Sequence, residues 1–141
     1  MASTMTANGN GHRQMTFDDL KGRRAEGYIR DSTLDQRDGF GPEIQRKNIR
    51  RFAESYGLSL GEPTYTEFVS GRSVRNRRAF QQFLEDGKID AYDVLLVDHT
   101  SRFGRNREEC IRYKGELKRL GKVVVFVSQG IISGSDRDFL N

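Results

Sequence analysis

Two spacings of apolar residues divide the chain into alternating strands and helices. Short apolar runs rich in β-branched and aromatic residues predict four strands, at residues 25–30, 64–69, 94–97 and 123–127. Apolar stripes at helical spacing predict three helices, at residues 42–56, 79–87 and 110–120. The stripe of the first helix runs through Ile44, Ile49, Phe52, Ala53 and Tyr56. The predicted order is therefore strand, helix, strand, helix, strand, helix, strand.

This order predicts the fold class. Strands that alternate with helices build a mostly parallel sheet with helices on both faces, so we expect a three-layer, open α/β sheet. The run Val94–Val97 is entirely apolar, which is typical of a strand covered on both faces. Functional residues in such sheets gather outside the carboxyl ends of the strands, because loops from neighbouring strands converge there.

Length and composition bound the organisation of the chain. Its 141 residues correspond to about one domain. Residues 1–20 begin with a stretch rich in Ser, Thr, Asn and Gly, so they are expected to be a disordered lead or an expression remnant, and residues 21–141 the folded domain. No apolar run is long enough for a membrane span or a signal peptide, which predicts a cytoplasmic protein with no membrane partner. The single cysteine, Cys110, provides no multi-thiolate metal site, so neither a metal nor a cofactor is expected.

Charge is distributed in blocks. The net charge of +4 and the pI near 9.4 favour a polyanionic partner. One basic block contains Arg72, Arg75, Arg77 and Arg78, and a second contains Arg102, Arg105 and Arg107. The acidic residues Glu85, Asp86, Asp90, Asp93 and Asp98 lie between the two blocks. If this partner is a nucleic acid, we expect Arg72, Arg75 and Arg78 to bind its phosphates.

Three polar clusters follow predicted strands, at residues 30–32, 70–72 and 98–102. A serine hydroxyl is a poor nucleophile unless its proton is removed and the charge on its target is stabilised. Guanidinium groups can hold the oxygens of a phosphodiester under attack through paired hydrogen bonds. A serine near several of these arginines therefore suits phosphoryl transfer on a polyanion.

Each candidate also has a structural interpretation. A serine after a strand, such as Ser32, is more often part of a turn or helix cap, and arginine runs are more often solvated faces. His99 at a strand end is more often structural than catalytic. Cys110 lies on an apolar helical stripe, which favours core packing, and the ring of Tyr28 is expected to pack in the sheet.

Three blocks of the sequence resemble the signatures of the resolvase/invertase family of serine recombinases. Residues 28–33, with Gln36 close behind, are similar to the opening signature of that family. Residues 67–71 and then 77–80 resemble its second block, an acidic residue before Ser-Gly followed by an arginine that leads into a helix. Residues 102–105 resemble the third block, which contributes two arginines.

The resemblance implies roles for individual residues. It implies that Ser32 is the nucleophile and that four arginines bind the phosphate and stabilise its charge: Arg30, Arg77, Arg102 and Arg105. It also implies supporting positions at Gln36, Glu67 and Ser70. Tyr28 and Ser101, which lie in the first and third blocks, are further candidate supporting positions. By the same resemblance, the serine attacks double-stranded DNA to form a 5′-phosphoserine bond without ATP or a metal, and subunits associate from dimer to synaptic tetramer. The family continues into a long interface helix and DNA-binding domains, so we expect a chain truncated to the catalytic domain.

Two features depart from the family's pattern. The family usually has an aspartate directly before the first arginine of its third block, and Ser101 stands there in this chain. Asp98 and His99 lie close by, but a shift of two or three residues changes the direction of a side chain, so the general acid and base stay unassigned. The loop between Gln36 and Gln45 is longer than in small resolvases and looks more like that of large serine integrases and transposases.

Two other classes of function are compatible with the predicted fold. One is a non-catalytic, DNA-associated module in which the serine and arginines provide only a basic surface. The other is an open-sheet domain for a nucleotide or flavin, which is disfavoured because the first strand-to-helix turn lacks a glycine-rich phosphate loop.

Overall fold

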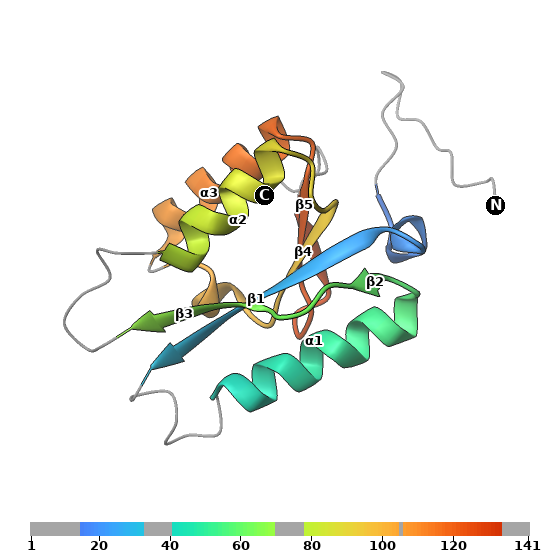
Figure 1. Ribbon diagram of the computed structural model, residues 1–141, viewed down its shortest axis with the longest axis horizontal. Helices are drawn as coiled ribbons and strands as arrows, with labels where there is room; N and C mark the ends of the chain where they lie inside the picture. Colours follow the sequence, from blue (N-terminus) through green and yellow to red (C-terminus); the bar gives the residue numbers. More distant parts are fainter. Residues whose placement is uncertain (1–14, 33–40, 70–77, 105, 134–141) are drawn as a thin grey trace.

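The computed structural model describes residues 15–32, 41–69, 78–104 and 106–133 (Figure 1). Its helices are α1 (Pro42–Tyr56), α2 (Arg78–Lys88) and α3 (Arg107–Arg119), with the short 3-10 helices η2 (Phe17–Leu20) and η4 (Thr100–Arg102). Its strands are β1 (Arg24–Ser32), β2 (Ser59–Leu60), β3 (Tyr65–Val69), β4 (Val94–Val97), β5 (Val123–Phe126) and β6 (Ile131–Ser133).

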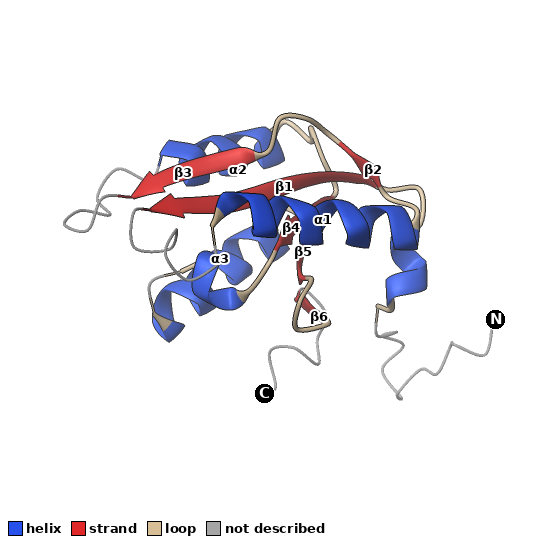
Figure 2. Ribbon diagram, turned by 90° about the horizontal axis from the view of Figure 1, so that it is seen from below, coloured by secondary structure: helices blue, strands red, loops and turns tan. Residues whose placement is uncertain are grey.

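The strands form one mostly parallel sheet in the order β2-β1-β4-β5-β6, and β3 pairs with β1 on the same side as β2. Among the described strand pairs, only that of β5 with β6 is antiparallel. Helix α1 runs along one face of the sheet, and α2 and α3 lie side by side on the other (Figures 1 and 2). The predicted three-layer α/β fold is confirmed.

Alternation along the strands divides the core between the two faces of the sheet. Leu96 packs in the cluster that contains Ile49 of α1, whereas Leu95 packs in the cluster that contains Phe83 of α2. All four residues of β4 are fully buried, which confirms that this strand is covered on both sides. The same alternation separates residues 29 and 28 of β1, so each position of β1 can be assigned to one face.

Three elements begin at places that the apolar pattern does not reveal. Strands β2 and β6 are only two and three residues long, too short for a periodic signal. Helix α3 begins at Arg107, earlier than predicted. The apolar pattern misses this start because the first turn of the helix is polar. Asn106 caps that turn, since its side-chain oxygen accepts the backbone N–H of Glu109 at 2.9 Å. Strand β6 follows a turn that contains Gly130 at a φ of 68°.

The expected lead ends earlier than residue 20. Residues 17–20 form η2, Leu20 is fully buried, and the ring of Phe17 packs edge-on against Phe52 and Tyr56 of α1, with centroids 5.3 and 5.0 Å apart. The boundary at residue 20 is therefore wrong for residues 15–20, because apolar side chains at positions 17 and 20 reach the α1 core. Residues 1–14 lie outside the described ranges.

The described helices include none that is both long enough and apolar enough to cross a membrane.

Candidate active site at the carboxyl edge of the sheet

Strand β1 continues beyond its neighbour β4. Its last pair with β4 joins Tyr28 and Val97, whereas its pairing with β3 continues to Ser32, opposite Val69. The far end of β1 therefore projects past β4 along one edge of the sheet, and it carries the first predicted cluster. The structure describes the backbone of Ser32, but the side chain of this residue lies outside what it describes.

A glutamine of α1 binds the projecting backbone of β1. Gln45 accepts the Arg30 backbone N–H with its Oε1 at 3.0 Å and donates its Nε2–H to the Arg30 carbonyl at 2.8 Å. These backbone groups lie on the β4 side, because the Arg24 carbonyl, six residues earlier, accepts from the N–H of Asp93 beside β4. Gln45 thus replaces the strand partner that β4 no longer provides.

The sequence interpretation missed Gln45 and misplaced Ile44. The apolar pattern places Ile44 on the stripe of the first helix, but its side chain is 42% exposed. Gln45 is fully buried and lies four residues before Ile49, in phase with the buried stripe. A polar residue in phase with an apolar stripe was the available signal.

Glu67 connects β3 to the beginning of α2. It is buried, lies opposite Arg30 in the pairing of β1 with β3, and its Oε1 accepts the backbone N–H of Phe80 at 3.1 Å. The same oxygen accepts the hydroxyl of Tyr28 at 3.4 Å. A carboxylate at a helix N-terminus binds unpaired N–H groups and favours the helix dipole, so Glu67 anchors the end of α2 that follows residues 70–77.

Tyr28 serves the core as well as this edge. Its ring packs edge-on against Phe80, Phe83 and Phe103, with centroids 6.0, 5.4 and 6.5 Å apart. The expectation that its ring packs in the sheet is confirmed. Its hydroxyl contributes the hydrogen bond to Glu67, so one side chain ties the core to the edge.

Asp98 faces away from the predicted site. It lies two residues after Leu96 and therefore on the face that α1 covers, where its Oδ1 accepts Nδ2–H of Asn48 at 3.0 Å. Arg30 and Glu67 have the parity of Tyr28 and Tyr65, on the opposite face. Asp98 is buried on that face, with 8% of it exposed. It therefore does not replace the aspartate that the family has directly before Arg102, where this chain has Ser101.

His99 has a structural role, as expected. Its Nδ1 accepts the backbone N–H of Ser101 at 3.1 Å and lies 3.2 Å from the Ser101 Oγ, which caps η4. Ser101 is exposed.

Arg102 ends η4 just beyond the carboxyl end of β4. It is 9% exposed, and its backbone N–H donates to the His99 carbonyl at 2.8 Å. At Gly104 the backbone passes so close to α3 that a Cβ at this position would lie 2.8 Å from the Cys110 sulfur. Cys110 packs against the aromatic core, as expected.

The structure therefore places Tyr28, Arg30, Glu67 and Arg102 at one edge of neighbouring strands, together with the Ser32 backbone. Arg78 is exposed at the start of α2. Six other predicted site residues lie outside the described residues: Gln36, Ser70, Arg72, Arg75, Arg77 and Arg105. Within the described ranges, no three His, Cys, Asp or Glu side chains gather as possible metal ligands.

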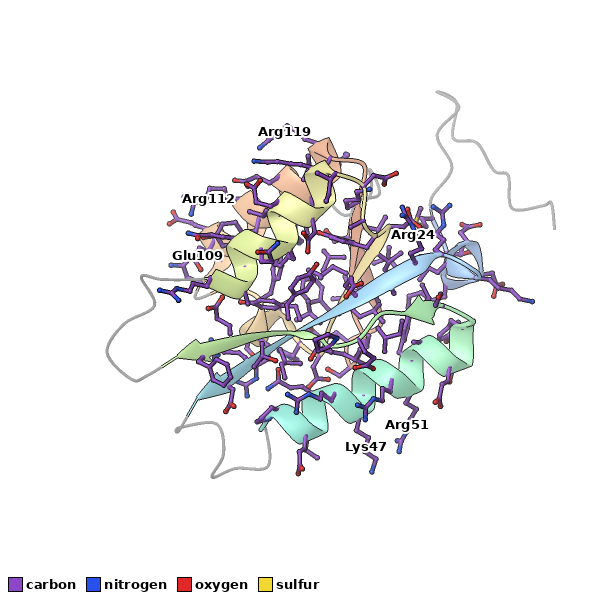
Figure 3. All side chains as sticks on the ribbon, viewed as in Figure 1. Arg24, Lys47, Arg51, Glu109, Arg112 and Arg119 are labelled. Atoms are coloured by element: carbon purple, nitrogen blue, oxygen red, sulfur yellow. The ribbon has the colours of Figure 1, made fainter. Side chains whose placement is uncertain are left out.

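A network of charges lies at the other end of β1, where Arg24 is labelled in Figure 3. Arg24 donates to both carboxylate oxygens of Asp93, at 3.1 and 2.9 Å, and to Asp90 at 3.1 Å. The hydrogen bond from Arg24 lowers the pKa of Asp93 to about 2. Because these contacts join the starts of β1 and β4, they stabilise the sheet far from the candidate site.

Residues 25–140 match the family described as Resolvase, N terminal domain. The chain belongs to this family. The match includes every strand and helix from β1 onward apart from the first residue of β1, and it confirms the predicted family. Membership supports the predicted function class, the catalytic domain of a site-specific recombinase.

Solved structures agree with the resolvase-family fold. The N-terminal catalytic domain of TP901-1 integrase superposes with a TM-score of 0.71, at 23% identity, over 84% of this chain and 88% of that one. A resolvase family site-specific recombinase from Streptococcus pneumoniae gives 0.67 at 25% identity, over 84% and 80%. The C-terminal catalytic domain of ISC1926 TnpA, an IS607-like serine recombinase, gives 0.61 at 20%, over 74% and 67%.

Proposed function

We propose that this resolvase-family domain cleaves and rejoins double-stranded DNA with Ser32 as the nucleophile. The observation that carries the proposal is the shared edge at which the Ser32 backbone, Arg30 and Glu67 lie beside the segment of Arg102. Strand alternation gives position 32 the parity of Arg30, so we expect both on the α2 and α3 face of the sheet.

The proposed reaction is a transfer. The Ser32 oxygen attacks a backbone phosphorus, a phosphorus–oxygen bond forms, and the bond to the 3′ oxygen breaks. The serine gives up its proton, the departing 3′ oxygen gains one, and the DNA 5′ phosphate remains on Ser32 as a phosphodiester. Attack by a 3′ hydroxyl on that bond reverses the step and reseals a strand. No residue is assigned as the proton acceptor or donor.

Arginines provide the charge stabilisation in this scheme. Arg30 is half-buried and Arg102 buried, and a hydrogen bond from a guanidinium to a phosphate oxygen is stronger where water is excluded. Arg77 and Arg105 are proposed as further members of the cluster. Gln36, Ser70 and Ser101 are proposed as supporting positions, and Arg72, Arg75 and Arg78 as contacts to flanking phosphates.

The proposed partners are DNA and further copies of the protein. We propose that subunits assemble from dimer to synaptic tetramer around two DNA sites in the cytoplasm, as in a large serine integrase or transposase. Binding through phosphates predicts an affinity that falls steeply as salt rises.

Covalent trapping tests the proposal. Wild-type protein, Ser32→Ala and the control Ser55→Ala, which changes an exposed serine of α1, are incubated with sheared and nicked genomic DNA from the source organism, then denatured. We expect an adduct for wild type and Ser55→Ala that maps to Ser32 by mass spectrometry and is absent in Ser32→Ala. The recovered DNA identifies the site.

The non-catalytic alternative predicts a different result. It predicts no adduct from any variant, together with equal, salt-dependent DNA binding by wild type and Ser32→Ala. The exposed Ser101 in the place of the family's aspartate is the observation that favours this alternative.

A further inference from the structure

The segment from Asp98 to Arg102 is held from outside its own strand. Asn48 of α1 donates to the Asp98 carboxylate at 3.0 Å. Ser128, in the turn between β5 and β6, donates to the Asp98 carbonyl from its Oγ at 2.7 Å and from its backbone N–H at 3.0 Å. Gln129, in the same turn, accepts the Thr100 N–H with its Oε1 at 2.9 Å.

These contacts lie beyond the end of β4, where strand pairing no longer fixes the path of the chain. Strand β4 ends at Val97, so the groups of Asp98 and Thr100 are no longer part of the sheet ladder. Asn48 and Ser128 bind both ends of residue 98, its carboxylate and its carbonyl, and Gln129 binds two residues later. The direction in which η4 leaves the sheet is therefore set by α1 and the β5–β6 turn.

The position of Arg102 depends on the direction in which η4 leaves the sheet. It is the last residue of η4, and its backbone N–H donates to the carbonyl of His99, which lies between the two held residues. A shift of residues 98–100 therefore moves the backbone that carries the guanidinium. Small displacements of a charge-stabilising group lower the rate of a reaction more than they weaken binding, because the group acts on charge that develops in the transition state.

We propose that Asn48, Ser128 and Gln129 are positioning residues that aim Arg102 at the reacting phosphate. The proposal rests on the proposed function of Arg102 and extends it to the opposite face of the sheet. All three residues line an open cavity of about 580 Å³ between α1 and the β5–β6 turn, whose wall also contains Arg51 and Ser55. They lie on the other side of the sheet from the candidate site and act on Arg102 through the backbone of residues 98–102.

Gln129 is the most suitable of the three residues for variants, because it is exposed and contacts this segment through its side-chain oxygen. Gln129→Leu removes the acceptor for the Thr100 N–H and keeps the size of the side chain. Gln129→Glu keeps an acceptor oxygen there and should restore the contact. The matched controls are Gln81→Leu, an exposed glutamine on α2, and Ser55→Ala, which changes the same cavity wall without a hydrogen bond to residues 98–102 in the described structure.

The first measurement uses the chain alone. Amide exchange at Thr100 and the NMR signal of the Arg102 Nε–Hε group are recorded for wild type and each variant. We expect Gln129→Leu to speed Thr100 exchange by about 3- to 10-fold and to shift the Arg102 signal. Gln129→Glu and both controls should match wild type. An Arg102 signal that is unchanged in Gln129→Leu overturns the proposal, whatever the activity.

The second measurement follows the rate of Ser32 adduct formation at saturating DNA, alongside DNA affinity. We expect Gln129→Leu to slow the adduct by about 3- to 10-fold, with an affinity within about twofold of wild type, and Gln129→Glu to recover the rate. Equal loss in both variants, or equal loss of affinity, overturns the positioning role. If wild type forms no adduct, the proposed function fails, and the NMR result still decides whether Gln129 positions Arg102.

Discussion

The bond between Gln45 and the Arg30 backbone allows a test of how the projecting end of β1 is held. Gln45→Leu keeps the approximate size of a fully buried side chain but removes both its acceptor and its donor. The Arg30 N–H and C=O then lose their partners beside a helix that limits access of water. The end of β1 that carries Ser32 should therefore be destabilised.

The magnitude follows from two opposing effects. Two partly buried backbone groups left without partners cost roughly 2–5 kcal/mol together. Burial of the more apolar leucine side chain returns roughly 1–2 kcal/mol. We therefore expect the free energy of unfolding to fall by about 2 kcal/mol, which in a domain of this size lowers the Tm by roughly 6–10 °C.

Urea and thermal unfolding of wild type, Gln45→Leu and the surface control Gln81→Leu measure this effect. The control should stay within about 0.5 kcal/mol of wild type. An unfolding midpoint for Gln45→Leu equal to that of wild type would refute the reasoning, because it would show that the Arg30 backbone needs no partner there.

Gln45→Glu adds a test in pH. When protonated, the glutamic acid can donate to the Arg30 carbonyl and accept from its N–H, as glutamine does, but the carboxylate cannot donate. The folded state therefore raises the pKa of this group above its unfolded value of about 4.3. Its stabilising contribution is present below the unfolded pKa and is lost as pH rises through the folded pKa. The stability deficit relative to wild type should shrink as pH falls from about 7 to 4, and a constant deficit would contradict the two-bond contact.

Three further variants test the frame around the site by urea unfolding. Glu67→Gln removes the charge at the start of α2 and should cost about 1 kcal/mol, whereas an unchanged midpoint would argue against the anchoring role. Gly104→Ala places a Cβ 2.8 Å from the Cys110 sulfur and should cost about 1–3 kcal/mol, while the control Gly115→Ala, with nothing within 4 Å, should stabilise α3 by up to about 1 kcal/mol; equal effects would contradict the close approach. Asp93, with a folded pKa of about 2, stabilises the protein above its unfolded pKa of about 3.9 and loses this effect as pH falls through 2, so Asp93→Asn should flatten the decline in stability between about pH 5 and 2. A decline as steep as that of wild type would exclude the ion pair as its cause.

The pattern of apolar residues predicted the α/β fold because a buried strand or helix face requires apolar residues within its own sequence. A strand covered on both faces, such as Val94–Val97, must be apolar throughout, and a helix packed on one side must show a stripe. The three sequence blocks also led to the family, since each follows a strand and the carboxyl ends of parallel strands share one edge.

The pattern failed where one contact between distant segments decides the outcome. Ile44 is more hydrophobic than Gln45, so the pattern favours burial of Ile44. Gln45 is buried instead, because the Arg30 backbone needs a hydrogen-bond partner. Residues 17–20 have too few apolar positions for a periodic signal, but Phe17 and Leu20 reach the core beside α1.

The sequence by itself determined the order of the longer strands and helices, the family, and the edge of the sheet at which Arg30, Glu67 and Arg102 lie. Only the tertiary structure decided which face each side chain occupies and what holds it there. Asp98 and Arg102 are four residues apart in one polar segment, yet Asp98 turns toward Asn48 of α1 while Arg102 ends a helix held by the β5–β6 turn. The physical reason is that buried polar groups must find hydrogen-bond partners, and here those partners lie on elements about 30–50 residues away in the sequence.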